Sequence, residues 1–326
     1  MIELLSEVPW LAGAAVIVVS MGLLYAVIGV LWARSCRSKV RLDNKVTIIT
    51  GGNTGIGKET AIDFAKRGAR VILACRNETK GESAAQDIRQ ATGNDNVVFK
   101  HLDLASFKSI RSFAEDINKN EKSLDILVNN AGVACERQLT EDGLEMIMGV
   151  NHFGHFLLTN LVLDKIKESK NSRIVVVASW GHSLIRSINF DDIQNEKDFN
   201  YLNVYCQSKL ANVYFTRELA KRLEGHGILV NTLHPGSVRT EIFRHMNPCT
   251  KLVGYPVALM FFKSAKQGAQ TTIQLAVSEE INGMTGLYFE NCRPVQMKPH
   301  ALDDEAAKRL WKLSEEMTGL APPQSL

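Results

Sequence analysis

Short apolar runs alternate along the chain with longer stretches whose apolar residues recur at helical spacing. The runs that predict strands cover residues 46–50, 71–75, 97–102, 126–129, 174–179, 228–233 and 286–289. Helices are predicted between them, for example over residues 56–67, 107–118, 143–163 and 204–223. Strands of near-continuous Val and Ile suit a sheet that is covered on both faces. The regular alternation therefore predicts an α/β fold with a Rossmann-like, doubly wound parallel sheet.

Residues 10–33 show a different pattern, because none of them carries a charge. As a helix with a rise of 1.5 Å per residue, this stretch is long enough to cross a hydrocarbon core of about 30 Å. It is longer than the apolar part of a secretory signal peptide, and acidic rather than basic residues precede it. A buried helix of a soluble core is the alternative, but the stretch is apolar on every side. The pattern therefore predicts an N-terminal transmembrane helix.

Basic side chains follow this stretch directly. They are Arg34, Arg37, Lys39, Arg41 and Lys45. Since positive charge beside a transmembrane helix favours the cytosolic side, the rest of the chain is expected to face the cytosol.

The six cysteines are scattered without a CxxC pair, so disulfides are not expected and zinc-ligand spacing is missing.

The overall composition excludes two classes of protein. Hydrophobic residues make up 45% and charged residues 22% of the chain, and the net charge is +3. These values exclude global disorder and are too balanced for a protein whose main partner is nucleic acid. The expected organisation is an anchor at 1–33, a basic linker at 34–45, one large domain at 46–300, and a C-terminal helix and tail at 301–326.

A glycine-rich turn follows the first predicted strand and precedes a predicted helix. Its residues are Thr50, Gly51, Gly52, Asn53, Thr54, Gly55, Ile56 and Gly57. Glycines permit a tight turn and let the N–H groups at the helix start approach a pyrophosphate. A Walker phosphate loop would need Ser or Thr after Gly57-Lys58, where Glu59 stands instead. The turn therefore predicts a dinucleotide site.

The end of the second strand indicates which dinucleotide binds. NAD sites place a carboxylate about 20 residues beyond the turn, where it binds the ribose 2′-hydroxyl. Arg76 stands at that position, and a guanidinium suits a 2′-phosphate. A solvated loop arginine is the alternative. We therefore predict NADP(H) as the cofactor.

Tyr205 and Lys209 lie four residues apart in YCQSK, which puts them on one face of a predicted helix. A nearby ammonium and a nicotinamide cation would stabilise the phenolate and lower the tyrosine pKa. The YxxxK pattern alone is common by chance. Ser179 gives it weight, because it ends a predicted strand and ligands of open α/β sheets bind at that edge.

Together these motifs resemble the short-chain dehydrogenase/reductase superfamily, in the family's order over residues 45–290. The matching motifs are TGGNTGIG, Asp103 in HLDL, NNAG at 129–132, Asn151, Ser179, YCQSK and the Pro-Gly pair at 235–236. The closer resemblance is to membrane-anchored, NADP-preferring retinol dehydrogenases, especially the photoreceptor type. It rests on residues 73–77, 205–213, 215–223 and 234–241. In that branch this strand usually ends in two serines. Here it ends in ASW at residues 178–180, and Ser179 aligns with the second of those serines.

The resemblance implies a role for each matching residue. Tyr205 would be the general acid in carbonyl reduction and the base in alcohol oxidation, while Lys209 would lower its pKa and bind the nicotinamide ribose. Ser179 would hydrogen-bond the substrate oxygen, and Asn151 would support a proton relay through water. The implied cofactor contacts are Gly51, Gly52, Asn53, Thr54, Gly55, Ile56, Gly57, Arg76, Asn77, Asp103, Leu104, Asn130, Ala131, Gly132, Tyr205, Lys209, Pro235, Gly236, Val238 and Thr240.

Three further signals carry less weight. His152 and His155 have a metal-like spacing, but no third ligand completes a set, so a packed pair is expected and no metal. Asn77-Glu78-Thr79 is a glycosylation sequon that cytosolic topology would leave unused. Residues 252–262 are apolar but too short to span a bilayer. They are either core or a substrate lid that also touches the membrane surface.

The sequence thus predicts an NADP(H)-dependent oxidoreductase that interconverts retinol and retinal, mainly by reducing retinal. Its expected location is the cytosolic face of an intracellular membrane, the endoplasmic reticulum. Its expected partners are a hydrophobic small molecule and the bilayer, with no nucleic acid. One alternative is a reductase of other hydrophobic aldehydes or of ketosteroids. Another is a catalytically silent, cofactor-binding membrane scaffold, against which the intact Ser179, Tyr205 and Lys209 argue.

Overall fold

The computed structural model describes residues 34–238 and 263–320. The predicted transmembrane helix at 10–33, the apolar stretch at 252–262 and Thr240 lie outside the described residues. Within the part of the chain that is described, no helix is both long enough and apolar enough to cross a bilayer.

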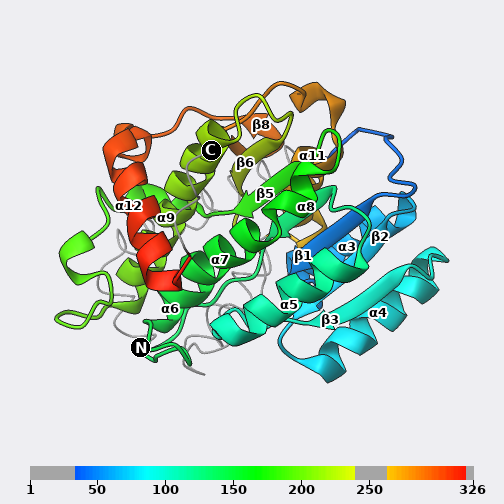
Figure 1. Cartoon of the computed structure of the whole chain (residues 1–326). Coiled ribbons are helices and arrows are strands. Elements are labelled where there is room, and N and C mark those ends of the chain that lie inside the picture. Colours follow the sequence, from blue (N-terminus) through cyan, green and yellow to red (C-terminus); the bar gives the residue numbers. More distant parts are fainter. Residues whose placement is uncertain (1–33, 239–262, 321–326) are drawn as a thin grey trace, which may run out of the picture.

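One eight-stranded sheet forms the centre of the fold, in the order β3-β2-β1-β4-β5-β6-β7-β8 (Figure 1). Its strands are β1 Val46–Thr50, β2 Arg70–Cys75, β3 Val97–His101, β4 Ile126–Asn129, β5 Arg173–Val177, β6 Leu229–His234, β7 Tyr288–Glu290 and β8 Arg293–Pro294. All neighbouring pairs are parallel except β7 with β8. The chain starts at the centre of the sheet and builds outward to both sides, which confirms the predicted doubly wound, Rossmann-like sheet.

Helices cover both faces of this sheet (Figure 1). On one side lie α3 Gly55–Lys66, α4 Glu78–Thr92 and α11 Ala265–Val277, and on the other α5 Phe107–Asn120, α7 Gly154–Leu161 and α9 Tyr201–Arg222. Short helices connect them: α8 Leu163–Lys167, η2 Trp180–Leu184, η3 Phe190–Asp192, η5 Glu279–Ile281 and η6 Pro299–Leu302.

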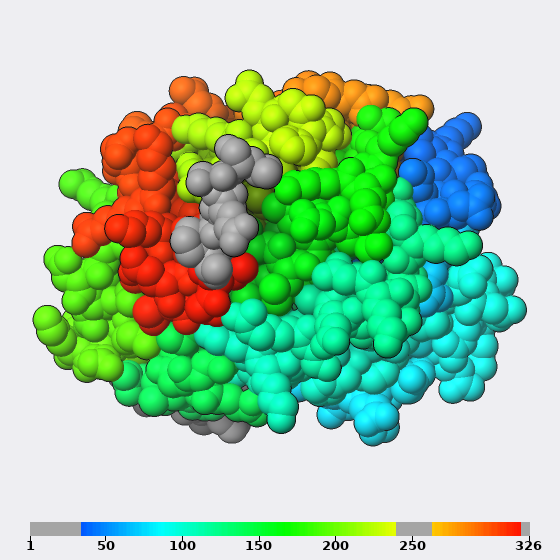
Figure 2. Space-filling view, in the orientation of Figure 1, coloured from blue at the N-terminus to red at the C-terminus, as the bar shows by residue number. Residues whose placement is uncertain are grey.

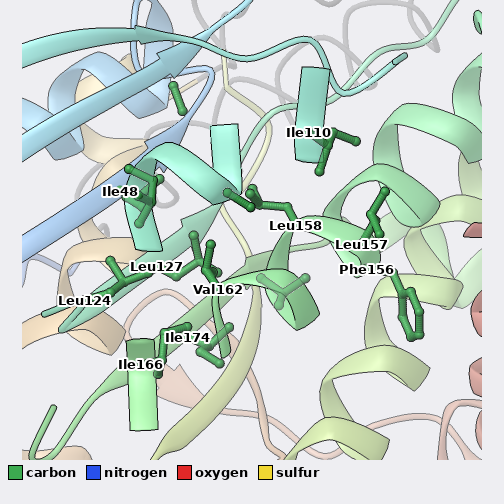
Figure 3. Close-up of a cluster of buried hydrophobic side chains, with 14 of the residues drawn as sticks. Ile48, Ile110, Leu124, Leu127, Phe156, Leu157, Leu158, Val162, Ile166 and Ile174 are labelled. Carbon is green, nitrogen blue, oxygen red and sulfur yellow. The ribbon is translucent and has the colours of Figure 1, made fainter. Parts of the chain in front are cut away.

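Alternate residues of each strand supply the two apolar cores. Ile48 of β1 packs in the core on the α5, α7 and α9 side (Figure 3), whereas its neighbour Ile49 packs on the α3, α4 and α11 side. Ile174 and Val175 of β5 divide in the same way. Successive strand side chains point to opposite faces, so strands buried on both faces must be apolar throughout. Burying each such side chain stabilises the folded state by about 1.5–3 kcal/mol.

The helix predicted over residues 143–163 is found over residues 146–161, but not as one regular α-helix. It is divided into α6 Met146–Met148, a π-helical turn η1 Gly149–Phe153, and α7. Glycines flank the turn because the chain passes close to its neighbours there. A Cβ on Gly149 would lie 2.6 Å from Thr140 Cγ2, and one on Gly154 would lie 2.6 Å from the Leu104 carbonyl oxygen. Such turns insert one residue into a helix and occur frequently at functional sites.

Strand β5 ends two residues earlier than predicted, at Val177. Ser179 therefore lies beyond the strand, in extended backbone, as the N-cap of η2. Its Oγ accepts a hydrogen bond from the Gly181 N–H at 3.1 Å, which fixes the side chain at the edge where the strands end.

The C-terminal helix α12, Asp304–Thr318, packs on α9 and α7. Trp311 supplies the main contact: its ring centroid lies 4.9 Å from that of Phe156 and 5.9 Å from that of Phe215. The Arg222 guanidinium lies 4.2 Å from the centroid of the same ring. This helix therefore closes one end of the apolar core.

The linker after residue 33 lies against the opposite end of the molecule (Figure 2). The Arg34 N–H donates to Asn291 Oδ1 at 3.0 Å, and the Arg67 guanidinium donates to the Ser38 carbonyl at 3.0 Å. These bonds fix the start of the described chain beside the β7–β8 turn.

Candidate active site

The structure brings Ser179, Tyr205 and Lys209 together. Tyr205 and Lys209 lie one turn apart on α9, and Lys209 Nζ is 5.5 Å from the centre of the Tyr205 ring. The Ser179 side chain hydrogen-bonds the Tyr205 hydroxyl. Gly181 makes this approach possible, because a Cβ there would lie 3.2 Å from Cys206 Sγ at the start of α9.

Burial controls the protonation of this group. Burial raises the pKa of Tyr205, and the hydrogen bond from Ser179 opposes part of that rise. Burial lowers the pKa of Lys209 to about 8, and Nζ donates to the Val177 carbonyl at 3.2 Å. Tyr205 is therefore protonated at neutral pH, as a proton donor must be. The lowering of its pKa by Lys209 together with a bound nicotinamide cation stays a prediction.

Asn151 lies in the π-helical turn, fully buried. Its Oδ1 accepts the Val133 N–H at 2.8 Å, and its Nδ2 donates to the Val133 carbonyl and to Ser208 Oγ, both at 3.0 Å. Both amide hydrogens are therefore used within the protein. The side chain clamps the segment after β4, and the role of Asn151 in a proton relay stays a prediction.

The glycine-rich turn has the geometry of a phosphate cradle. Gly51 and Gly55 adopt positive φ values of 64° and 55°, which favour glycine. A Cβ on Gly57 would lie only 2.4 Å from the Gly51 carbonyl oxygen. Thr54, the N-cap of α3, makes no side-chain capping bond. The first N–H groups of a twelve-residue helix thus face the turn without a side-chain cap, which fits a pyrophosphate.

Asn130 and Ala131 lie directly beside this turn. Their backbone N–H groups both donate to Thr50 Oγ1 at 2.9 Å, and Asn130 Nδ2 donates to the Thr50 carbonyl at 2.8 Å. Gly132 follows, and a Cβ on it would lie 3.4 Å from both Asn151 Oδ1 and Lys209 Nζ. The Asn130–Gly132 segment therefore connects the phosphate cradle to the buried lysine.

Arg76 and Asp103 lie at the same edge of the sheet, because Cys75 at the end of β2 pairs with His101 at the end of β3. Arg76 is exposed. The Asp103 carboxylate accepts the Ala105 N–H at 2.9 Å, so it also shapes its own loop. Leu104, next to it, is buried.

The Asn77 side chain already makes a hydrogen bond within the protein, whereas Arg76 is exposed. Its Oδ1 accepts the Lys80 N–H at 2.8 Å as the N-cap of α4. Any cofactor contact through Asn77 therefore comes from its remaining amide or its backbone.

The segment after β6 completes the site. Gly236 has a positive φ of 88°, and Val238 forms a backbone bridge with Lys263. A Cβ on Gly268 of α11 would lie 2.5 Å from Val238 Cγ2 and 3.3 Å from Ile56 Cγ1. The Pro235–Val238 segment thus lies near the start of α3, on the cofactor side of the sheet edge.

No individual role was assigned from the sequence to three residues of the site. Thr50 supports the Asn130 segment through its hydroxyl. His182 Nδ1 approaches the Ser179 carbonyl at 2.7 Å, and Lys263 lies beside Gly236. Motif order gave a signal for Thr50, and His182 stands only three residues after Ser179. Lys263 reaches the site only through the tertiary fold.

His152 and His155 are both fully buried. Burial lowers the pKa of His152 to about 3 and that of His155 to about 4, so both rings are neutral. Over residues 34–238 and 263–320, no three His, Cys, Asp or Glu side chains group in a way that could hold a metal ion.

Comparisons with known proteins agree with this geometry. A family model described as short chain dehydrogenase matches residues 45–250. The chain is 49% identical over 286 residues to retinol dehydrogenase 12 of Homo sapiens, covering 87% of this chain and 90% of that one. It is 48% identical over 295 residues to retinol dehydrogenase 13 of Homo sapiens, covering 89% of each.

Solved structures share the fold. A protein of Mycobacterium paratuberculosis is 32% identical with a TM-score of 0.71, covering 87% of this chain and 97% of that one. A short chain dehydrogenase of Escherichia coli CFT073, complexed with NADPH, is 23% identical with a TM-score of 0.61, covering 78% and 100%. The chain therefore belongs to the short-chain dehydrogenase/reductase family, whose members use NAD(P)(H), and is an oxidoreductase homologous to retinol dehydrogenases.

Proposed function

We propose that this protein uses NADPH to reduce retinal to retinol, and that it catalyses the reverse oxidation at the same site. The observation that carries the proposal is the Ser179–Tyr205–Lys209 group at the strand ends, adjoining a glycine turn that fits a pyrophosphate. The 49% identity to a retinol dehydrogenase supports the retinoid as substrate.

Each residue has a defined task in this proposal. Ser179 and Tyr205 hold the carbonyl oxygen by hydrogen bonds, and Tyr205 passes its hydroxyl proton to that oxygen. Lys209, buried beneath the tyrosine ring, stabilises the phenolate that results. The chemistry supplied by bound NADPH is a hydride for the carbonyl carbon. Asn151 acts on the segment at Val133 rather than on the substrate.

Apolar side chains at the site favour a hydrophobic carbonyl. Trp180 and Leu184 follow Ser179 and are 53% and 55% exposed, and Leu202, three residues before Tyr205, is 56% exposed. They belong to η2 and α9, which pack against each other, and in this proposal they contact the apolar part of the substrate. They support equally the second candidate, a reductase of other hydrophobic aldehydes or of ketosteroids.

The test is the substrate profile of the full-length protein in microsomes. NADPH-dependent reduction of all-trans-retinal is expected to exceed that of a straight-chain aldehyde and of a ketosteroid in kcat/KM. A higher kcat/KM for the straight-chain aldehyde or for the ketosteroid would instead favour that substrate class. Absence of activity on all three would favour the silent scaffold.

We assign the preference for NADP(H) to Arg76. The change Arg76→Ala is expected to raise the KM for NADPH roughly 10- to 100-fold, because a charge-assisted hydrogen bond contributes about 1.5–3 kcal/mol. The KM for NADH should stay within about twofold, since NADH has no 2′-phosphate. Steady-state kinetics with both cofactors measures this, and an equal loss for both would contradict the assignment.

We also propose that residues 10–33 anchor the protein in the endoplasmic reticulum membrane, with the catalytic domain in the cytosol. The basic cluster supports this orientation, and the bond from Arg34 to Asn291 would keep the domain close to the anchor. Full-length protein should stay in the pellet after carbonate extraction, and protease added to intact microsomes should digest its C-terminus. Glycosylation at Asn77 would overturn the topology.

A further inference from the structure

His155 lies on α7 with its ring buried between two parts of the site. Its Nε2 is 2.9 Å from Thr50 Oγ1 at the end of β1, and its Nδ1 is 3.2 Å from the Asn151 carbonyl oxygen in the π-helical turn. The ring therefore joins the strand that leads into the phosphate cradle to the turn beside Lys209.

The partners define the tautomer. A carbonyl oxygen can only accept, so Nδ1 carries the proton and the Nε2 of the neutral ring is an acceptor. The Thr50 hydroxyl therefore donates to Nε2. The same hydroxyl also lies 3.4 Å from the Val128 carbonyl oxygen. If its single hydrogen pointed there instead, Nε2 would have no donor.

This arrangement saturates Thr50 Oγ1. With its hydrogen directed at His155, its two lone pairs accept the N–H groups of Asn130 and Ala131. The next residues are held from the other side, because the Asn151 side chain bonds the N–H and carbonyl of Val133. His155 thus contacts both residues that support the 130–133 segment, one at each end.

In the proposed function, the position of that segment affects both the dinucleotide site and Lys209. Asn130 adjoins the glycine turn, and Gly132 passes so close to Lys209 Nζ that a Cβ would lie 3.4 Å from it. A displacement of the segment would alter both the cofactor surface and the surroundings of Lys209. Sites of this kind need supporting residues with locked orientations.

We propose that His155 is a positioning residue which, as a neutral ring, sets the 130–133 segment between the dinucleotide site and Lys209. The inference rests on the proposed NADP(H) site. In this proposal His155 acts through Thr50 and Asn151, the residues that its ring nitrogens contact.

His152 provides a matched control. It is equally buried, three residues earlier, but its Nε2 pairs with Ser314 Oγ of α12 at 2.8 Å, away from the cofactor edge. We compare His155→Phe, His155→Gln and His152→Phe in full-length detergent-solubilised protein. Thermal unfolding and the Kd for NADPH by fluorescence titration are measured for each.

Both phenylalanine variants are expected to lower Tm, whereas only His155→Phe should raise the NADPH Kd, by about tenfold or more. His155→Gln should recover most of the affinity, because an amide can donate to Asn151 and accept from Thr50. A Kd within twofold of wild type for His155→Phe, or an equal rise for His152→Phe, would overturn the proposal.

A second measurement needs no variant. In ¹⁵N-histidine-labelled wild type, NMR should show a neutral ring protonated at Nδ1 for His155, and a ring protonated at Nε2 would overturn the inference. If wild type itself binds no NADPH, the proposed function fails, which is a different outcome from a normal Kd in His155→Phe.

Discussion

Replacing Tyr205 with phenylalanine is expected to reduce kcat for NADPH-dependent retinal reduction by about 10²- to 10⁴-fold, the range of general acid catalysis. The change removes the hydroxyl that hydrogen-bonds Ser179 but keeps the ring 5.5 Å from Lys209 Nζ. The Kd for NADPH should therefore rise by no more than about tenfold, the effect of losing one neutral hydrogen bond to the cofactor. Single-turnover reduction at saturating NADPH separates the two quantities.

Tyr214→Phe is the matched control on the same helix. The Tyr214 hydroxyl donates to the His300 carbonyl at 2.7 Å, so its loss should lower stability by about 1 kcal/mol and leave kcat unchanged. If Tyr205→Phe kept more than a tenth of the wild-type kcat, Tyr205 would not be the proton donor.

Replacing Trp311 with alanine is expected to lower the free energy of unfolding by about 3–5 kcal/mol. The ring is 5% exposed, packs on Phe156 and Phe215, and donates to Glu315 Oε1 at 2.7 Å. Calorimetry should show a Tm lower by roughly 10 °C, given about 2–4 °C per kcal/mol for a domain of this size.

Trp180→Ala is the matched control, because it makes the same substitution at an exposed position. With 53% of its surface exposed, Trp180→Ala should change stability by about 0.5 kcal/mol or less. Similar Tm losses in the two alanine variants would mean that α12 is not an integral part of the core.

The sheet could be predicted because its strands are buried on both faces. A run such as VTIIT in β1 has few other structural solutions, and the helices between such runs follow from the need to cover both faces. The glycine turn was equally predictable, since Gly51, Gly55 and Gly57 occupy positions where the backbone requires glycine. The membrane segment and Thr240 lie outside the described residues and stay predictions.

Other parts of the site could not be predicted from local pattern. Apolar residues are so frequent over residues 143–163 that the extra residue of the π-helical turn causes no clear break in their pattern, so the sequence favoured one regular helix. The Asn151 clamp on Val133 and the His155 bond to Thr50 join residues far apart along the chain. Such contacts exist only after the sheet has formed, and a single sequence carries no direct signal for them.

The π-helical turn at Gly149–Phe153 also limits how this chain can vary. An α-helix advances about 100° per residue, so deleting one residue here would rotate the rest of α7 by that angle. His155 and Thr159, which now bond Thr50 and Asn129, would then face away from their partners. The shortened helix would be more regular in its backbone and yet worse matched to the sheet. Insertions and deletions in this family member should therefore be tolerated in the surface loops long before they are tolerated in this turn.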